Sequence, residues 1–336
     1  MNGASPAALA AAVCNAGGLG SCAASLLSPD AIVRMVREMQ SLTDKPFNVN
    51  LFVLGEPQPD HAEIFRSLQR LAPFYRALAI PPPRTPPVFC ENFETQLEAL
   101  LYAAPPVVSF TFGILTAEQV GRFRRAGCLV IGTATTVAEG IAWENVGADF
   151  ICAQGAEAGG HRATFLGDVE QSCIGLIALV LQMAAAVAIP VIAAGGIMDG
   201  RGIASVMLLG AQAAQLGTAF LSCPECPISS AWKEQLLSAS DDSTRLTRTF
   251  SGRYARAIVN EFMQTMRAHE TTVQDYPIQN ALTTPMRREA THAGRPEFMS
   301  MWAGQGAGMS RRLAAVELMA TLVRELDAAG GRLLCR

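Results

Sequence analysis

The chain has 336 residues, half of them hydrophobic and only 16% charged, which excludes a disordered protein and supplies enough apolar material for a large core. Its formal net charge is −3 and its arginines are scattered, so the basic stripe of a nucleic-acid-binding protein is missing and no nucleic-acid partner is expected. Apolar runs stay well short of the ~20 residues of a membrane span, and the N-terminal stretch lacks the basic start of a signal peptide. We therefore expect a cytoplasmic protein without membrane contact.

Short apolar runs alternate with helical patterns along the chain, which is typical of repeated βα units around a parallel sheet. The helix expected between Ser28 and Thr43 illustrates the pattern: Ser28 can cap it, Pro29 suits its first position, and apolar side chains recur at helical spacing. Most expected strands are apolar throughout, as parallel strands covered on both faces are. Seven strands are expected, at residues 18–22, 47–52, 107–110, 129–132, 149–154, 190–194 and 213–216.

This pattern predicts an α/β fold, a (β/α)₈ TIM-type barrel, although such a barrel needs eight strands. The chain enters its first expected helix at Pro6, so we expect the first strand to be missing from the N-terminus of this sequence. The segment from Pro224 to about Gly294 is expected to be helical, with no clear strands, and to form a cap. We assign residues 1–222 and 301–336 to the barrel and residues 223–300 to a small helical cap domain. The helix expected at residues 310–334 closes the barrel.

Glycine-rich loops follow the last two expected strands, where barrels of this type bind phosphate. One loop contains Gly195 and Gly196, and the other contains Gln215, Gly217 and Thr218. Glycines let the backbone approach a phosphate closely, and the N-termini of the following helices offer free N–H groups. Two such loops in consecutive units indicate a phosphate-bearing ligand; the alternative is that the glycines only make tight turns.

A third loop, Gln154-Gly-Ala-Glu-Ala-Gly-Gly-His161, follows the strand at 149–154. Gln154 could bind a polar ring edge with its amide, and His161 could take or give a proton near neutral pH. A lone histidine is usually structural, but this one follows a glycine-rich turn at the functional end of a strand, so we predict that it is catalytic. Asn50, near the end of another strand, could bind a cofactor or only the neighbouring backbone.

Nine cysteines without regular spacing favour reduced thiols over a disulfide framework. Cys223-Pro-Glu-Cys226 lacks the second pair, or the two histidines, that a zinc site needs, and no metal is expected. The glycines between Gly304 and Gly308 do not complete a dinucleotide-binding fingerprint.

Taken together, these motifs resemble the nitronate monooxygenase family, formerly called 2-nitropropane dioxygenases, over nearly the whole chain. Two later segments are more similar to the class I enzymes of that family: Ser251-Gly-Arg-Tyr-Ala-Arg256 and Met301-Trp-Ala-Gly-Gln-Gly306. The four main motifs correspond to residues 10–20, 46–52, 147–161 and 190–197.

The resemblance implies FMN as cofactor and His161 as the catalytic residue beside the flavin. It places Tyr254 in the substrate pocket wall and Gln305 in a segment near the flavin. The implied flavin-binding residues are Asn50, Gln154 and Gly159 for the ring and ribityl chain, and Gly195, Gly196, Gln215, Gly217 and Thr218 in the phosphate loops.

The sequence departs from the family in three ways. Members usually begin some twenty residues earlier, with a strand that ends in a Pro-Met turn, and Met1 corresponds to that methionine. Thr111 stands where several relatives carry histidine, and Ala219 replaces a frequent arginine. The lost strand would remove a flavin contact, and Ala219 would weaken phosphate binding.

The implied reaction is the FMN-dependent oxidation of alkyl nitronates, such as propionate 3-nitronate, by O₂ to a carbonyl compound and nitrite, in a monomer or homodimer. Two alternatives stay open. One is an NAD(P)H-dependent FMN reductase of the same superfamily, acting on enoyl-acyl-carrier protein or quinones. The other is a degenerate, non-catalytic barrel that binds a phosphate ligand.

Overall fold

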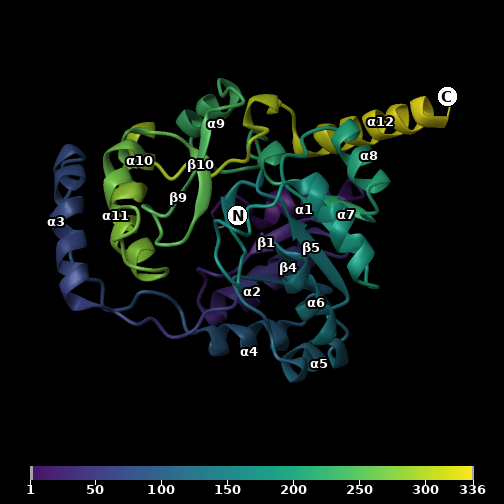
Figure 1. Ribbon diagram of the computed structural model, residues 1–336, viewed down its shortest axis with the longest axis horizontal. Coiled ribbons are helices and arrows are strands. Elements are labelled where there is room, and N and C mark those ends of the chain that lie inside the picture. The colour runs from purple at the N-terminus through teal and green to yellow at the C-terminus, as the bar shows by residue number, and fades with distance from the viewer. Residues whose placement is uncertain (1–2, 335–336) are drawn as a thin grey trace.

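Seven parallel strands form the central sheet of the computed structural model, which describes residues 3–334 (Figure 1). All seven expected strands are present, with boundaries shifted by a few residues, and they are adjacent in chain order as βα units require. The strands are β1 (Ser21–Ala23), β2 (Asn48–Phe52), β3 (Val107–Thr111), β4 (Leu129–Ala134), β5 (Phe150–Gln154), β7 (Val191–Ala194) and β8 (Ala213–Gln215).

The sheet is not closed within the described residues. β1 pairs only with β2, and β8 pairs only with β7. A cavity of about 420 Å³ touches both edge strands, and its lining includes apolar side chains of α1 (Ala7–Asn15) and α12 (Ala315–Leu334). The expected first strand is not among residues 3–334, and Met1 lies outside the described residues. The architecture is therefore that of a TIM-type barrel with seven of its strands in place.

Helices follow the strands and cover the outer face of the sheet (Figure 1). Local signals set where they begin: the Ser28 hydroxyl accepts from Ala31 N at 3.4 Å, and Thr116 and Gln119 form a reciprocal capping box. The helix expected from Ser310 begins only at Ala315. The other sheet-covering helices are α2 (Pro29–Leu42), α4 (Phe93–Ala103), α5 (Ala117–Arg125), α6 (Val137–Asn145), α7 (Leu176–Ala186) and α8 (Gly200–Leu208).

A second layer lies over one end of the sheet and corresponds to the expected cap. The expectation that residues 224–294 contain no strands is wrong, because β9 (Thr244–Thr247) and β10 (Ala255–Ile258) pair antiparallel there. Each has only four residues and carries an arginine, so neither shows the apolar run that identified the barrel strands. β10 also pairs with β6 (Gly160–His161), which joins the cap to the barrel. The cap helices are α9 (Ser230–Leu237), α10 (Glu261–Thr265) and α11 (Ile278–His292).

Helix α3 (His61–Ala77) belongs spatially to this layer although it precedes it by more than 150 residues (Figure 1). The Tyr75 hydroxyl donates to Leu282 O at 2.8 Å, and the rings of Phe74 and Phe262 are 4.8 Å apart. The long segment between β2 and β3 thus adds a helix to the cap. Short 3₁₀ turns complete the fold at Thr218–Phe220, Met266–His269, Pro296–Phe298 and Ala307–Met309.

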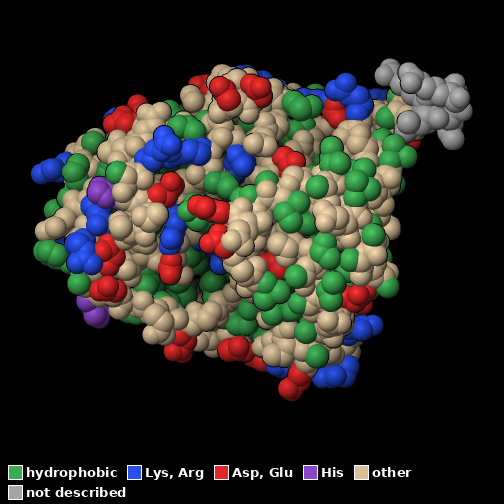
Figure 2. All heavy atoms as spheres, in the orientation of Figure 1, with side chains coloured by type: hydrophobic (Ala, Val, Ile, Leu, Met, Phe, Trp, Pro, Cys, Tyr) green, Lys and Arg blue, Asp and Glu red, His purple; other side chains and the backbone are tan. Residues whose placement is uncertain are grey.

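The surface carries no single-sign field on the face shown in Figure 2, where acidic and basic side chains are interspersed. Among the residues that the structure describes, no helix combines the length and apolarity needed to cross a membrane.

Candidate active site

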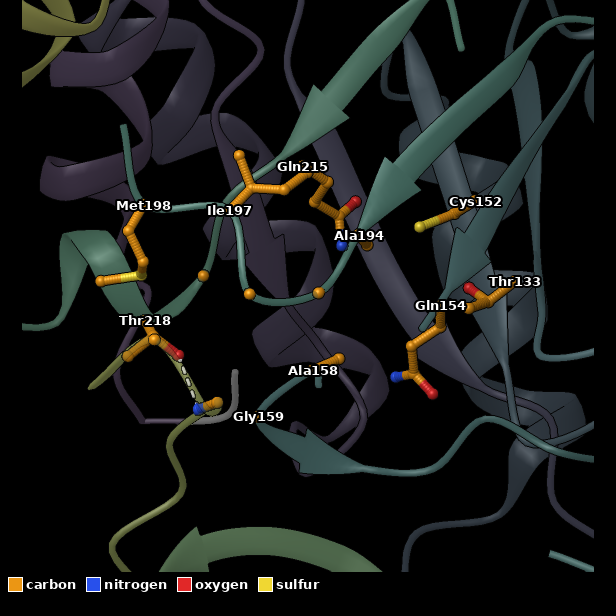
Figure 3. Close-up of a pocket in the computed structure, with 15 residues that line it drawn as sticks. Thr133, Cys152, Gln154, Ala158, Gly159, Ala194, Ile197, Met198, Gln215 and Thr218 are labelled. Atoms are coloured by element: carbon orange, nitrogen blue, oxygen red, sulfur yellow. Dashed lines mark hydrogen bonds between the residues drawn. The ribbon is translucent and has the colours of Figure 1, made fainter. Parts of the chain in front are cut away.

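A cavity of about 100 Å³ lies at the carboxyl ends of β5, β7 and β8 (Figure 3). The structure brings seven of the predicted cofactor-binding residues to its wall: Gln154, Gly159, Gly195, Gly196, Gln215, Gly217 and Thr218. Carboxyl ends of parallel strands meet at one edge of a sheet, which explains why loops far apart in sequence converge here. The remaining lining residues are Thr133, Cys152, Ala158, Ala194, Ile197, Met198, Gly304 and Gly306.

Glycine is required at several points of this wall. Gly195 and Gly196 have φ angles of +137° and +67°, which side-chain-bearing residues rarely adopt. Gly159 lies so close to the segment after β10 that a Cβ there would meet the backbone of Gly304 at 2.4 Å. At Gly217, in contrast, a Cβ would meet nothing within 4 Å. The wall of the cavity therefore has open space at Gly217 and tight packing at Gly159.

A phosphate-bearing cofactor fits this wall at its glycine loops. The Thr218 hydroxyl accepts from Gly304 N at 2.9 Å, so the last barrel loop is tied to the segment that closes the cavity (Figure 3). Asp199 already caps α8, accepting from Gly202 N at 2.8 Å and pairing with Arg201. A phosphate would consequently be held by the loops before the helices rather than at the first turn of α8.

His161 stands on β6 and is fixed there by Gln154. The Gln154 amide nitrogen donates to His161 O at 3.0 Å, and its oxygen accepts from Ala163 N at 2.9 Å. Both ends of this amide are thus engaged with the histidine segment. Arg162 lies between His161 and Ala163 in the chain and is fully buried. It donates to Gly155 O at 2.6 Å, which ties the histidine segment to the residue that follows β5.

Aromatic rings surround the His161 imidazole. Their centroids lie 5.2 Å (Trp302), 5.3 Å (Phe112), 5.7 Å (Tyr276) and 6.2 Å (Phe52) from the imidazole centroid. Phe112 has a φ of 78°, a strained conformation for a bulky residue at the end of β3. Such an aromatic, largely apolar surrounding strengthens electrostatic interactions made within it.

Two guanidinium groups add positive charge beside this histidine. Neither Arg253 nor Arg287 has a carboxylate within 4 Å among the described residues. Arg253 donates to Arg162 O at 3.0 Å and lies 4.1 Å from the Phe112 ring centroid. Burial lowers the pKa of each guanidinium to about 10, which leaves both charged at neutral pH.

Burial, followed by the charges of Arg253 and Arg287, lowers the pKa of His161 to about 3. The imidazole is therefore neutral at physiological pH. The Ser251 hydroxyl oxygen lies 2.9 Å from its Nε2 atom. The arrangement can accept or donate one proton at a neutral ring, next to fixed positive charge.

Three predicted residues lie away from this group. The Asn50 amide nitrogen donates to the Ser109 carbonyl oxygen at 3.2 Å, a backbone interaction of the kind that the sequence left open, and to the Ser109 hydroxyl at 3.0 Å. The Tyr254 ring lies 5.9 Å from the Arg248 guanidinium and does not belong to the aromatic set around His161. Gln305 is exposed. Their roles stay predictions.

Cys223 and Cys226 are buried free thiols, and burial raises the pKa of Cys223 to about 12. In the part of the chain that the structure describes, no three metal-ligating side chains cluster.

Sequence reasoning missed the side chains that the cap and the segment after it bring to His161: Ser251, Arg253, Tyr276, Arg287 and Trp302. Ser251, Arg253 and Trp302 stand in the segments that resemble class I enzymes, and that was the available signal. Nothing in the sequence pattern marks Tyr276 or Arg287, which reach the site only through the packing of the cap.

Comparison with known proteins agrees with this geometry. The family model for nitronate monooxygenase matches residues 1–325. The chain belongs to the nitronate monooxygenase family. A nitronate monooxygenase of Pseudomonas aeruginosa is 43% identical over 330 residues, covering 97% of this chain and 94% of its own length. A probable nitronate monooxygenase of Staphylococcus haemolyticus is 38% identical over 328 residues, covering 97% and 92%.

Solved structures extend the likeness to the fold. Nitroalkane oxidase from Streptomyces ansochromogenes superposes with a TM-score of 0.91 at 41% identity, covering 99% of this chain and 95% of its own. FabK from Thermotoga maritima gives a TM-score of 0.77 at 27% identity, covering 99% and 92%. The resemblance inferred from the motifs is confirmed, the fold class is the expected one, and the chain is an oxidoreductase of this family.

Proposed function

We propose that this enzyme oxidises alkyl nitronates with O₂, through bound FMN, to a carbonyl compound and nitrite. The observation that carries the proposal is the placement of the His161 imidazole among four aromatic rings, near the charges of Arg253 and Arg287, on a segment held by Gln154 of the glycine-lined cavity. A nitronate is an anion, and buried cations without carboxylate partners favour an anionic ligand over a neutral one. Family membership supports the same reaction.

The chain's residues have separable tasks in this reaction. Gly195, Gly196, Gly217 and Thr218 would hold the FMN phosphate, and the loop at Gly159 would border the ribityl chain and ring. FMN, when bound, supplies the electron acceptor for the substrate and the electron donor for O₂.

The cap residues exclude water and orient the substrate. Arg253 and Arg287 supply fixed charge, which spares the site any reorganisation when the anion enters. His161 is close enough to the surrounding aromatic rings to reach a ligand bound among them. The imidazole would position the nitronate there or take a proton from a neutral nitroalkane.

The first test is the visible spectrum of the purified protein, followed aerobically by nitrite release and oxygen consumption with propionate 3-nitronate. We expect a yellow protein that does both. His161→Asn should retain FMN and lose activity, and near-normal turnover by this variant would refute the assigned role.

The second candidate is the NAD(P)H-dependent FMN reductase of the same superfamily that the sequence motifs left open. Rapid bleaching of the flavin by NADH, with no nitro compound present and no nitrite released from propionate 3-nitronate, would favour it. A colourless protein that refuses added FMN would instead favour a non-catalytic barrel.

A further inference from the structure

We infer that Ser251 is a positioning residue that holds His161 in the tautomer with its proton on Nε2, leaving Nδ1 as the free basic nitrogen. The inference rests on the proposed function for its catalytic meaning, but its structural content concerns only this chain. It follows from the hydrogen bonds that a single hydroxyl can make.

The Ser251 hydroxyl has three hydrogen-bond partners. Its oxygen lies 2.9 Å from His161 Nε2 and 3.0 Å from the carbonyl oxygen of Arg253, and it accepts from Arg253 N at 3.4 Å; Ser251 is fully buried. A hydroxyl has one proton to donate and two lone pairs to accept with. The Arg253 carbonyl can only accept, so the hydroxyl proton goes there.

The Arg253 carbonyl has no other donor among the described residues. Leaving this partly buried carbonyl without a donor costs free energy, which favours donation of the hydroxyl proton to the carbonyl over donation to the ring. The remaining bond, between Ser251 and His161, must then run from Nε2–H to the hydroxyl oxygen.

The ring forms no other hydrogen bond with the described residues. In a neutral imidazole with its proton on Nε2, the other nitrogen carries a lone pair. Nδ1 is accordingly the atom of His161 that can accept a proton from a substrate. Ser251 acts through the histidine and is not itself a reacting group.

The turn that carries Ser251 is firmly attached to the histidine segment. Arg162 N donates to Tyr254 O at 2.8 Å, and the Arg253 side chain donates to Arg162 O and to Thr164 O. Pairing of Ala255 with His161 fixes the register between the two strands. The hydroxyl and the imidazole are therefore placed by one continuous set of backbone contacts.

Nitrogen NMR of protein labelled with [¹⁵N]histidine tests the assignment directly, with FMN bound and with FMN removed. The chain has four histidines, and the signals lost in His161→Asn identify the ring. We expect a pyrrole-type resonance for Nε2 and a pyridine-type resonance for Nδ1. The reverse pattern would overturn the inference.

Ser251→Ala should convert the two resonances to averaged values of mixed tautomers and lower kcat/KM for a neutral nitroalkane about tenfold, as loss of one orienting hydrogen bond does. Ser300→Ala is the matched control, because the Ser300 hydroxyl accepts from Arg287 at 3.3 Å and forms no hydrogen bond with His161. In this variant the tautomer of His161 should match that of the wild type. Unchanged resonances in Ser251→Ala would refute the role of Ser251. A correct tautomer in a protein that releases no nitrite would refute the proposed reaction alone.

Discussion

His161 should make the stability of this enzyme depend on pH. Its pKa is about 3 in the folded protein, against 6.5 for an unperturbed histidine, because burial and the charges of Arg253 and Arg287 disfavour the imidazolium. Tyr276, the remaining titratable group at the ring, has a pKa raised by burial and stays neutral. Below pH 6.5 the unfolded chain binds a proton at this position and the folded chain does not, so stability falls as the pH is lowered.

The size of the effect follows from the two values. At pH 7.5 the histidine is neutral in both states and contributes almost nothing. At pH 5, protonation of this histidine in the unfolded chain lowers the free energy of unfolding by up to about 2 kcal/mol, because each pH unit below 6.5 contributes ~1.4 kcal/mol. Solvent that reaches the partly exposed ring screens the charge and makes this an upper limit.

Urea denaturation of wild type and His161→Asn at pH 7.5, 6 and 5 measures this contribution. The contributions of the other titrating groups cancel when the unfolding free energies of the two proteins are subtracted at each pH. We expect the wild type to lose up to about 2 kcal/mol relative to the variant over this interval. His61→Asn, a change at an exposed histidine, should lose stability in parallel with wild type. Equal pH dependence in wild type and His161→Asn would show that the imidazole charges freely in the folded protein, and would refute the electrostatic account of the site.

Further predictions concern two glycines in the wall of the cavity and the buried Glu139 carboxylate. Gly159→Ala should destabilise the protein by about 1–3 kcal/mol in urea denaturation, because its Cβ would collide with the Gly304 backbone; unchanged stability would contradict the close approach. Gly217→Ala should leave the unfolding free energy unchanged and weaken FMN binding measured by flavin fluorescence, since the methyl group enters open space; unchanged FMN affinity would place the phosphate elsewhere. Glu139→Ala should cost about 3 kcal/mol or more, because this buried carboxylate accepts from Thr135 and from the backbone of Phe165; a loss below 1 kcal/mol would exclude that role.

The barrel was readable from the sequence because each of its signals is local. Apolar runs marked the strands, and the loop at Gly195 and Gly196 needs glycine because both residues have positive φ angles. The same signals placed His161 at the functional end of β5, since strand ends in a parallel sheet share one edge.

The cap was not readable in the same way, because its contributions depend on contacts between distant segments. β9 and β10 are short and carry arginines, so their pairing is apparent only once β6 supplies the adjoining strand. Tyr276 and Arg287 reach the histidine from a helical region with no motif of its own. Asn50 is a case that the sequence left open: its amide is engaged with Ser109, and its role toward the cofactor stays a prediction.

The division between barrel and cap also bears on how substrate can be accommodated. β6 carries the catalytic histidine and pairs with β10 of the cap, and the turn before β10 carries Ser251 and Arg253. A rigid movement of the cap away from the barrel at this edge would have to break those strand hydrogen bonds and the Arg253 contacts together. The imidazole, its serine partner and one of the two guanidinium groups therefore behave as one unit. Adjustment to substrates of different size then falls to the side chains that are not tied to this unit, above all Tyr276, whose ring meets the histidine edge-on.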